Sequence, residues 1–425
     1  MGTRMKVVYD VSSLGLGHAD TTHRTGIFRV VDRVARGLAA SGRCDLRLSA
    51  MESVRAYGHA VQYARTVPEL RGVPFTPAPA GTGLVARLDR GFHARVGAGA
   101  SVPTKVVRRV LLHGRKAADP VLRAVRPPAV AGGDLFHSPR FALPAPARTR
   151  PAVRVLTVHD LIPILFPRMS SPFGIRELRG ILGSLRPDDW AIAISERTRD
   201  DLCAYRPELD PARVFVIPWA ADPVLFYPVR DEGVVARARA RYGIPEGPYL
   251  LSLNTLEPRK NMERLVRSFA ALTAAQGIRD LSLVLVGPRG LRADSVYQAA
   301  RGAGPRVALA GFVPDEDLAA LYSGAMAFVY PSLYEGFGLP PLEAMQCGTP
   351  VITSNSSSLP EVVGGAGLMV NPTDDDALSQ AMLDVYRDSA LRERLRERSL
   401  ARAAEFSWAR CVRQTLDAYR AARTA

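Results

Sequence analysis

The chain has 425 residues, with 56 Lys and Arg against 41 Asp and Glu and a formal net charge of +15. This length predicts two or three domains, and the absence of any run of 18 apolar residues argues against a membrane-spanning helix. The four cysteines are scattered, and residues 1–10 show a short strand pattern rather than a secretory signal, so we expect a cytoplasmic protein.

Short strand-like runs alternate with amphipathic helices, which is the pattern of a parallel α/β sheet. The first half begins with a strand over Lys6–Tyr9, a Gly-rich loop containing Gly15 and Gly17, and a helix over Gly26–Ala40. Further strands are expected at Cys44–Ser49, Val153–Val158, Ala191–Ile194 (followed by Ser195 as a helix N-cap) and Val214–Ile217.

The region from Pro68 to Pro146 is rich in Pro, Ala, Gly and Arg and carries a concentrated positive charge. Residues 85–126 hold ten Lys and Arg against only Asp89 and Asp119, with apolar residues between them. Such a stretch suits peripheral contact with an anionic membrane or a lipid diphosphate, but a solvated basic helix is an equal alternative. No zinc spacing or aromatic platform supports nucleic-acid binding, which we do not expect.

A second α/β series follows a break near Asp222 to Gly233. Its strands are expected at Tyr249–Leu253, Leu281–Val286, Val307–Ala310, Ala327–Tyr330 and Pro350–Thr353. We therefore predict an N-terminal domain over 1–228, a C-terminal domain over 229–405 and a final helix over 406–425 that packs back toward the N-terminal domain. Two such halves would form a cleft, with ligands at the carboxyl ends of the strands.

The most informative segment is Glu335–Met345, in which two carboxylates, Glu335 and Glu343, stand eight positions apart around a Gly-rich turn. Pro340 and Pro341 predict the start of a helix, where free N–H groups and the helix dipole favour an anion. An anionic ligand with hydroxyl groups on both sides of its charge, such as a nucleotide sugar, would suit this arrangement.

Another strand-end segment offers two cations. Arg259 and Lys260 precede a helix that begins near Met262, with Asn261 as its expected cap, and they could hold a diphosphate. The turns Gly287–Gly290 and Gly311–Pro314 could form the wall of a base pocket.

Together these segments resemble the retaining family 4 glycosyltransferases (glycosyl transferases group 1). The resemblance is carried in family order by residues 25–29, 157–161, 193–195, 256–261, 311–314, 331–344 and 358–362. It implies the GT-B architecture, in which two Rossmann-like domains face each other across a cleft, and transfer of a hexosyl unit from a nucleotide diphosphate sugar.

The resemblance also implies roles for individual residues. Arg259 and Lys260 would neutralise the donor diphosphate, and Glu335 would contact the transferred sugar. His159 would face the same sugar from the N-terminal domain. Asp160 would orient His159, and Glu343 would bind the ribose. The backbone amides of Gly336, Phe337, Gly338 and Leu339 would support the sugar and phosphate. The base would contact Gly311, Phe312 and Val313, and the phosphates would lie near Gly15 and Gly17.

Several alternatives remain open at this level. The acidic runs Asp315–Asp317 and Asp374–Asp376 fit helix N-termini better than a metal site, so neither a metal nor another cofactor is expected. The resemblance favours GDP-mannose over UDP sugars and a glycan or lipid-linked acceptor in cell-surface polysaccharide biosynthesis. Another enzyme of this fold, such as a sugar-nucleotide epimerase or a phosphorylase, and a non-catalytic nucleotide-sugar-binding protein remain alternatives.

Overall fold

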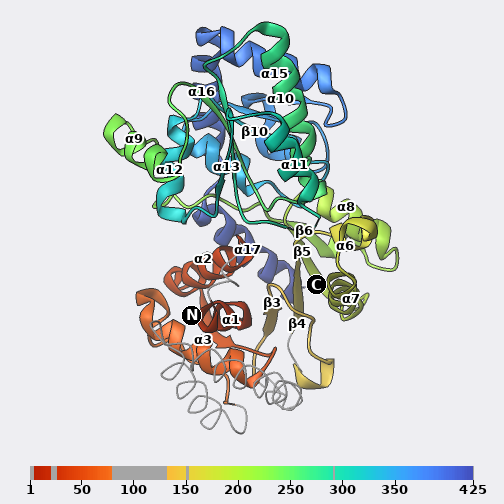
Figure 1. Cartoon of the computed structure of the whole chain (residues 1–425). Helices are drawn as coiled ribbons and strands as arrows, with labels where there is room; N and C mark the ends of the chain where they lie inside the picture. Colours follow the sequence, from red (N-terminus) through yellow and green to blue (C-terminus); the bar gives the residue numbers. More distant parts are fainter. Residues whose placement is uncertain (1–3, 21–25, 79–131, 150–152, 291, 425) are drawn as a thin grey trace, which may run out of the picture.

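The computed structural model describes residues 4–20, 26–78, 132–149, 153–290 and 292–424. They form two lobes joined by a narrow waist, each built around a six-stranded parallel sheet with helices packed against it (Figure 1). The predicted GT-B architecture of two facing α/β domains is thereby confirmed. The basic segment over 85–126 lies outside the described residues.

The N-terminal sheet has the strand order β2-β1-β3-β4-β5-β6. Its strands are β1 (Met5–Asp10), β2 (Cys44–Ser49), β3 (Leu135–Ser138), β4 (Val153–Val158), β5 (Trp190–Ala193) and β6 (Val214–Val216). The helices of this lobe are α1 (Ser12–Ala19), α2 (Gly26–Ser41), α3 (Val54–Thr66), α6 (Ile162–Leu165), α7 (Pro172–Gly183) and α8 (Glu196–Tyr205). Most strand residues are buried, as expected for a parallel sheet covered on both faces.

The C-terminal sheet has the order β12-β11-β10-β7-β8-β9. Its strands are β7 (Tyr249–Leu253), β8 (Ser282–Val286), β9 (Val307–Gly311), β10 (Ala327–Tyr330), β11 (Val351–Ser354) and β12 (Leu368–Val370). Its helices are α9 (Glu232–Arg241), α10 (Met262–Gln276), α11 (Asp294–Gly302), α12 (Asp315–Gly324), α13 (Leu339–Gln346), α14 (Leu359–Val363), α15 (Asp375–Arg387) and α16 (Ser389–Ala403). The segments that follow β4, β7 and β10 all reach the cleft between the lobes.

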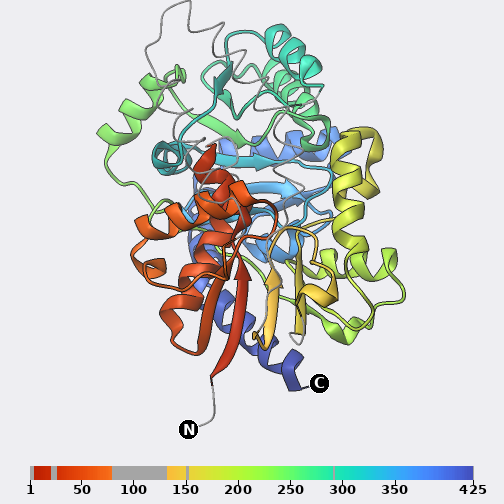
Figure 2. The same cartoon turned by 90° about the horizontal axis from the view of Figure 1, so that it is seen from below.

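The last helix, α17 (Trp408–Thr424), crosses from the upper lobe of Figure 1 to the lower one and packs against α2. Its Tyr419 is fully buried, and the Tyr419 hydroxyl lies 2.5 Å from His137 Nδ1 on β3. Seen from below, the end of α17 (dark blue) lies beside the N-terminal sheet (Figure 2). The C-terminal helix therefore completes the core of the N-terminal domain.

One local prediction is wrong. The expected Gly-rich loop over Gly15–Gly17 is the helix α1. Gly15 packs against α3 so closely that an added Cβ would lie 2.0 Å from the carbonyl oxygen of Ala56. A glycine is therefore needed there for helix packing. In the part of the chain that the structure describes, no helix is long and apolar enough to span a membrane.

Candidate functional site

A cleft of about 560 Å³ lies between the two lobes. The C-terminal domain lines it with the segments 253–260, 286–288 and 312–318 and with the loop and helix start at 335–343. The N-terminal domain contributes residues that include Gly26, Arg29, Arg140, His159 and Asp160. The cleft thus joins most of the residues that the sequence singled out, but Gly15, Gly17 and Gly311 are not among its lining residues.

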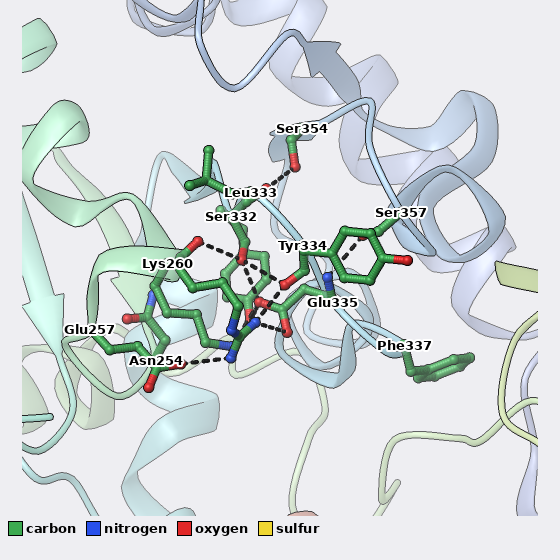
Figure 3. Close-up of polar contacts among 12 residues, drawn as sticks. Asn254, Glu257, Lys260, Ser332, Leu333, Tyr334, Glu335, Phe337, Ser354 and Ser357 are labelled. Carbon is green, nitrogen blue, oxygen red and sulfur yellow. Dashed lines mark hydrogen bonds and ion pairs between the residues drawn. The ribbon is translucent and has the colours of Figure 1, made fainter. Parts of the chain in front are cut away.

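Glu335 is the centre of a polar network at the floor of this cleft (Figure 3). Its Oε1 accepts hydrogen bonds from Lys260 Nζ at 2.7 Å and from the Tyr330 hydroxyl at 2.9 Å, and also from Ser332 Oγ. Its Oε2 lies 3.0 Å from Arg259 Nη1. The carboxylate is therefore paired with both cations that were expected at the diphosphate.

These contacts decide the charge states of the network. Burial would raise the pKa of Glu335, but Lys260 and Arg259 outweigh it and lower the pKa to about 2. Burial lowers the pKa of Lys260 despite the opposing charge of Glu335. Burial also acts to lower the pKa of Arg259, but Glu335 and Glu257 more than offset it and raise the value. Glu335 is thus ionised at neutral pH.

The cations are placed by the short 3₁₀ helix Pro258–Lys260, which follows β7 and precedes α10. Asn261 adopts a left-handed backbone conformation with φ of 62°. Asn261 occupies the N-cap position of α10 as predicted, but its side chain makes no capping bond, and Asn261 Nδ2 instead donates to the carbonyls of Pro331 and Pro372. These two bonds fix the turn against the segments that follow β10 and β12.

The Gly-rich turn leads into α13, whose first turn contains Pro340 and Pro341 as predicted. Gly338 precedes the helix with φ of 122°, a conformation that a side chain would strain. Because proline has no N–H, Leu339 supplies the only amide among the first three residues of the helix. An anion at this helix start would therefore meet few donors, which leaves most of its neutralisation to Arg259 and Lys260.

The N-terminal domain holds this turn directly. Ser195 Oγ donates to the carbonyl oxygen of Gly336 at 2.7 Å, and Ser195 also caps α8 as predicted. The carboxylate of Glu361 accepts the backbone N–H groups of Glu196 and Arg197 at 2.7 and 2.8 Å. The start of α8 thereby links the two domains beside Glu335.

His159 lies at the end of β4 and lines the cleft next to Trp219, with ring centroids 5.2 Å apart. Its Nε2 lies 2.7 Å from the carbonyl oxygen of Pro139, which can only accept, so Nε2 carries the proton. Nδ1 is then an acceptor, and it has no partner among the described residues. Burial lowers the pKa of His159 to about 4, so the ring is neutral.

Asp160 does not orient His159 as expected. Its Oδ1 accepts the N–H of Ile162, and so it stabilises the turn that begins α6. The carbonyl of Pro139 performs the orienting role because the β3 end lies beside the β4 end in the sheet. Asp160 nevertheless lines the cleft near the cations, and burial raises its pKa.

Glu343 lies one turn into α13 and is almost completely buried. Its Oε1 pairs with Arg29 Nη2 at 3.0 Å, and its Oε2 accepts from the Tyr322 hydroxyl at 3.2 Å. Burial raises the pKa of Glu343, and the charge of Arg29 opposes this shift. Arg29 belongs to one of the segments that carry the family resemblance, residues 25–29, but no role was predicted for it.

The turn after β9 places Phe312 at the wall of the cleft with 72% of its surface exposed. Gly311 has φ of 69°, and Val313 is buried beneath the turn. An exposed aromatic ring on a cleft wall is a suitable surface for stacking a nucleobase. The contact with a base remains a prediction.

Arg140 is a further cleft residue that the sequence did not identify. Its guanidinium stacks on Phe141 and makes no ion pair with any described residue. Arg140, His159 and Asp160 also line a smaller cavity of about 170 Å³, which extends toward Glu177 on α7. Nothing in the spacing of Arg140 distinguishes it from the other arginines of the chain.

The chain is similar to known proteins in both sequence and structure. Residues 235–402 match the family described as "Glycosyl transferases group 1". The "O-antigen chain mannosyltransferase B" of Escherichia coli is 37% identical over 290 residues, which are 67% of this chain and 74% of that protein. The chain belongs to the group 1 glycosyltransferases.

This glycosyltransferase has longer relatives as well. The "Serotype-specific mannosyltransferase WbdA" of Escherichia coli is 30% identical over 331 residues, which cover 75% of this chain but only 40% of WbdA. Among solved structures, the sucrose-phosphate synthase of Thermosynechococcus elongatus superposes with a TM-score of 0.62 at 21% identity, over 98% of this chain and 99% of that one. The glycosyltransferase WaaG superposes with a TM-score of 0.60 at 15% identity, over 97% of this chain and 98% of WaaG, which supports the same GT-B fold.

Proposed function

We propose that this glycosyltransferase transfers a mannosyl unit from GDP-mannose to a saccharide acceptor, with retention of the anomeric configuration. The observation that carries the proposal is the network in which Arg259 and Lys260 flank Glu335 on the cleft floor, opposite His159. The mannosyltransferase relatives support the choice of sugar and a role in cell-surface polysaccharide biosynthesis.

The proposed reaction breaks one bond at the anomeric carbon and forms another on the same face. The bond from the anomeric carbon to the β-phosphate oxygen breaks, and Arg259 and Lys260 stabilise the charge that gathers on the departing diphosphate. An acceptor hydroxyl oxygen bonds to the anomeric carbon from the same face, and its proton passes to the departing phosphate oxygen. The products are a glycoside and free nucleoside diphosphate.

Glu335 and His159 bind the transferred sugar in this scheme. Glu335 stays ionised and accepts hydrogen bonds from sugar hydroxyl groups, while Nδ1 of His159 accepts one from the other side. Because His159 is neutral and its Nε2 proton is held by Pro139, it serves as an acceptor rather than as a general acid.

We place the acceptor in the 170 Å³ cavity beside Arg140 and Glu177, which opens next to His159. A carboxylate and a guanidinium at one cavity suit the hydroxyl groups of a sugar ring, and the cation also suits a phosphate group. The cavity adjoins the site proposed for the transferred sugar, as direct transfer requires.

Three assays test the proposal. GDP should be released from GDP-mannose only when an acceptor saccharide is present, whereas a binding protein would release none and an epimerase would not depend on the acceptor. A Glu335→Gln variant should lose turnover, whereas Glu263→Gln, at an exposed ion pair on α10, should not.

NMR of the product should show the anomeric configuration of the donor; an inverted product would refute the retaining mechanism.

We further propose that turnover needs no divalent metal. Asp315 pairs with Arg29 and Asp317 pairs with Arg241, so these carboxylates are already neutralised by cations. Among the described residues no group of three or more His, Cys, Asp or Glu could hold a metal ion. Turnover should therefore persist in EDTA, and a loss that Mg²⁺ or Mn²⁺ restores would refute this.

The cytoplasmic location and the membrane contact of residues 85–126 remain proposals, supported by the charge of that segment. Flotation with anionic liposomes should recover the wild-type protein and less of a variant with Arg108 and Arg109 changed to Glu. Equal recovery of both proteins in the unbound fraction would refute the membrane contact.

A further inference from the structure

Arg29 makes two ion pairs across the cleft, at the end where we place the nucleotide. Arg29, in the first turn of α2, belongs to the N-terminal domain, whereas its partners Glu343 and Asp315 belong to the C-terminal domain. Its Nη2 lies 3.0 Å from Glu343 Oε1, and its Nη1 lies 3.4 Å from Asp315 Oδ2. The guanidinium also lies 5.5 Å from the ring centroid of Phe226.

Among the described residues, Arg29 is the cation that contacts Glu343. The other titratable groups that face this carboxylate are Asp315 and Tyr322 on α12 and Cys347 at the end of α13. The negative charge of Asp315 disfavours the ionised form of Glu343, whereas the uncharged hydroxyl group of Tyr322 donates a hydrogen bond to it. Without Arg29, burial and Asp315 would both favour the protonated form of Glu343.

The hydrogen bonds that Glu343 makes to described residues leave part of its hydrogen-bonding capacity unused. A carboxylate offers about four lone-pair positions. Arg29 occupies one position on Oε1, and Tyr322 occupies one on Oε2. The remaining capacity suits two neighbouring hydroxyl groups, such as those of a ribose, and Arg29 can stay in place while they bind.

We propose that Arg29 is a positioning residue for the donor: it keeps Glu343 ionised and oriented toward the ribose hydroxyls and makes this recognition depend on closure of the two domains. The inference rests on the proposed function, in which Glu343 binds the ribose of the donor. Because Arg29 comes from the opposite lobe, opening of the cleft removes the cation from Glu343. Tight nucleotide binding and the closed arrangement therefore favour each other.

Calorimetric titration with two probes, GDP and 2′,3′-dideoxy-GDP, tests this role. Arg29→Gln should lose about tenfold to a hundredfold in affinity for GDP, the range for a hydrogen bond to a charged group. It should bind the dideoxy nucleotide as the wild type does, because that probe lacks the hydroxyls that Glu343 would bind. Arg29→Lys, which keeps the charge, should lose less, and Arg267→Gln, at an exposed pair on α10, should lose nothing.

The pH dependence gives a second readout. GDP affinity should weaken as the pH falls and Glu343 becomes protonated, and this loss should occur at higher pH in Arg29→Gln than in the wild type. The double variant Arg29→Gln, Glu343→Gln should bind GDP no more weakly than Glu343→Gln alone, because Arg29 acts through Glu343.

Equal losses for both nucleotides in Arg29→Gln, or additive effects in the double variant, would overturn the proposal. Thermal unfolding of each variant separates these outcomes from loss of the fold, and Arg29→Lys provides the same comparison if Arg29→Gln does not fold. A wild-type protein that binds neither GDP nor UDP and turns over no nucleotide sugar would instead refute the proposed function.

Discussion

Replacement of Gly336 by alanine tests whether the closed arrangement of the two domains is the active one. An added Cβ at Gly336 would lie 2.3 Å from the carbonyl oxygen of His159 and 2.8 Å from Asp160 Cβ, both in the opposite domain. Since real Cβ atoms essentially never come closer than 3.0 Å to another heavy atom, the two domains must separate locally by about 0.7 Å or more. Gly336 itself has no positive φ, so the variant adds no backbone strain.

This displacement falls between Glu335 and His159, which we place on opposite sides of the transferred sugar. A misplacement of about 1 Å in a catalytic site can cost about a hundredfold in rate, so we expect kcat of Gly336→Ala to fall by about that factor. Affinity for free GDP should also fall, because closure supports the contact between Arg29 and Glu343, but by less than kcat, because the domains need to separate only locally at Gly336.

Steady-state kinetics with GDP-mannose and titration with GDP provide the two measurements. Gly365→Ala is a matched control, since an added Cβ at Gly365 meets no atom within 4 Å. Circular dichroism and thermal unfolding verify that Gly336→Ala is folded. If a folded Gly336→Ala retained the wild-type kcat, the closed arrangement could not be required for catalysis.

Three further predictions concern single residues. Lys260→Met should lower kcat/KM by about a hundredfold to a thousandfold, as removal of a charge-stabilising donor does elsewhere, and kinetics that match the wild type would refute the role of Lys260. Phe312→Ala should weaken GDP binding by about tenfold through loss of base stacking, with little change in Tm because the ring is exposed; unchanged affinity would show that the base binds elsewhere. Burial lowers the pKa of His137 to about 3, so between pH 6.5 and pH 3 the unfolded chain binds a proton that the folded protein does not. The free energy of unfolding of the wild type, measured relative to that of His137→Gln by denaturant titration, should therefore fall by up to about 1.4 kcal/mol per pH unit as the pH is lowered through that range. If the difference in unfolding free energy between the two proteins did not change with pH, His137 could not be buried in the neutral state.

Much of the fold was predictable because parallel strands buried on both faces leave largely apolar runs, such as Tyr249–Leu253 and Ala327–Tyr330. The sequence did not predict β3, β12 or α3. The strands Leu135–Ser138 and Leu368–Val370 are only four and three residues long, and β3 follows a Pro- and Ala-rich stretch that hides its pattern. The glycine spacing around Gly15 also led to the wrong prediction of a loop, because this glycine is needed for close packing against α3.

The site was predictable where its residues follow one another in a motif and unpredictable where the fold brings distant residues together. Glu335, Arg259 and Lys260 follow strand ends, and the order of the strands in the sheet places β7 next to β10. Arg29, Arg140 and the carbonyl of Pro139 enter the site only through tertiary packing. A backbone carbonyl carries no sequence signal, and one arginine among many in a basic chain carries little.

The route of α17 has a consequence for how this protein is made. The core of the N-terminal domain contains Tyr419, Leu416 and Cys411, and these residues leave the ribosome after the whole C-terminal domain. Domains ordinarily fold in the order of synthesis. Residues 408–424, which complete this core, are translated last, so a premature stop near residue 405 would leave both halves translated but the core of the first one unfinished.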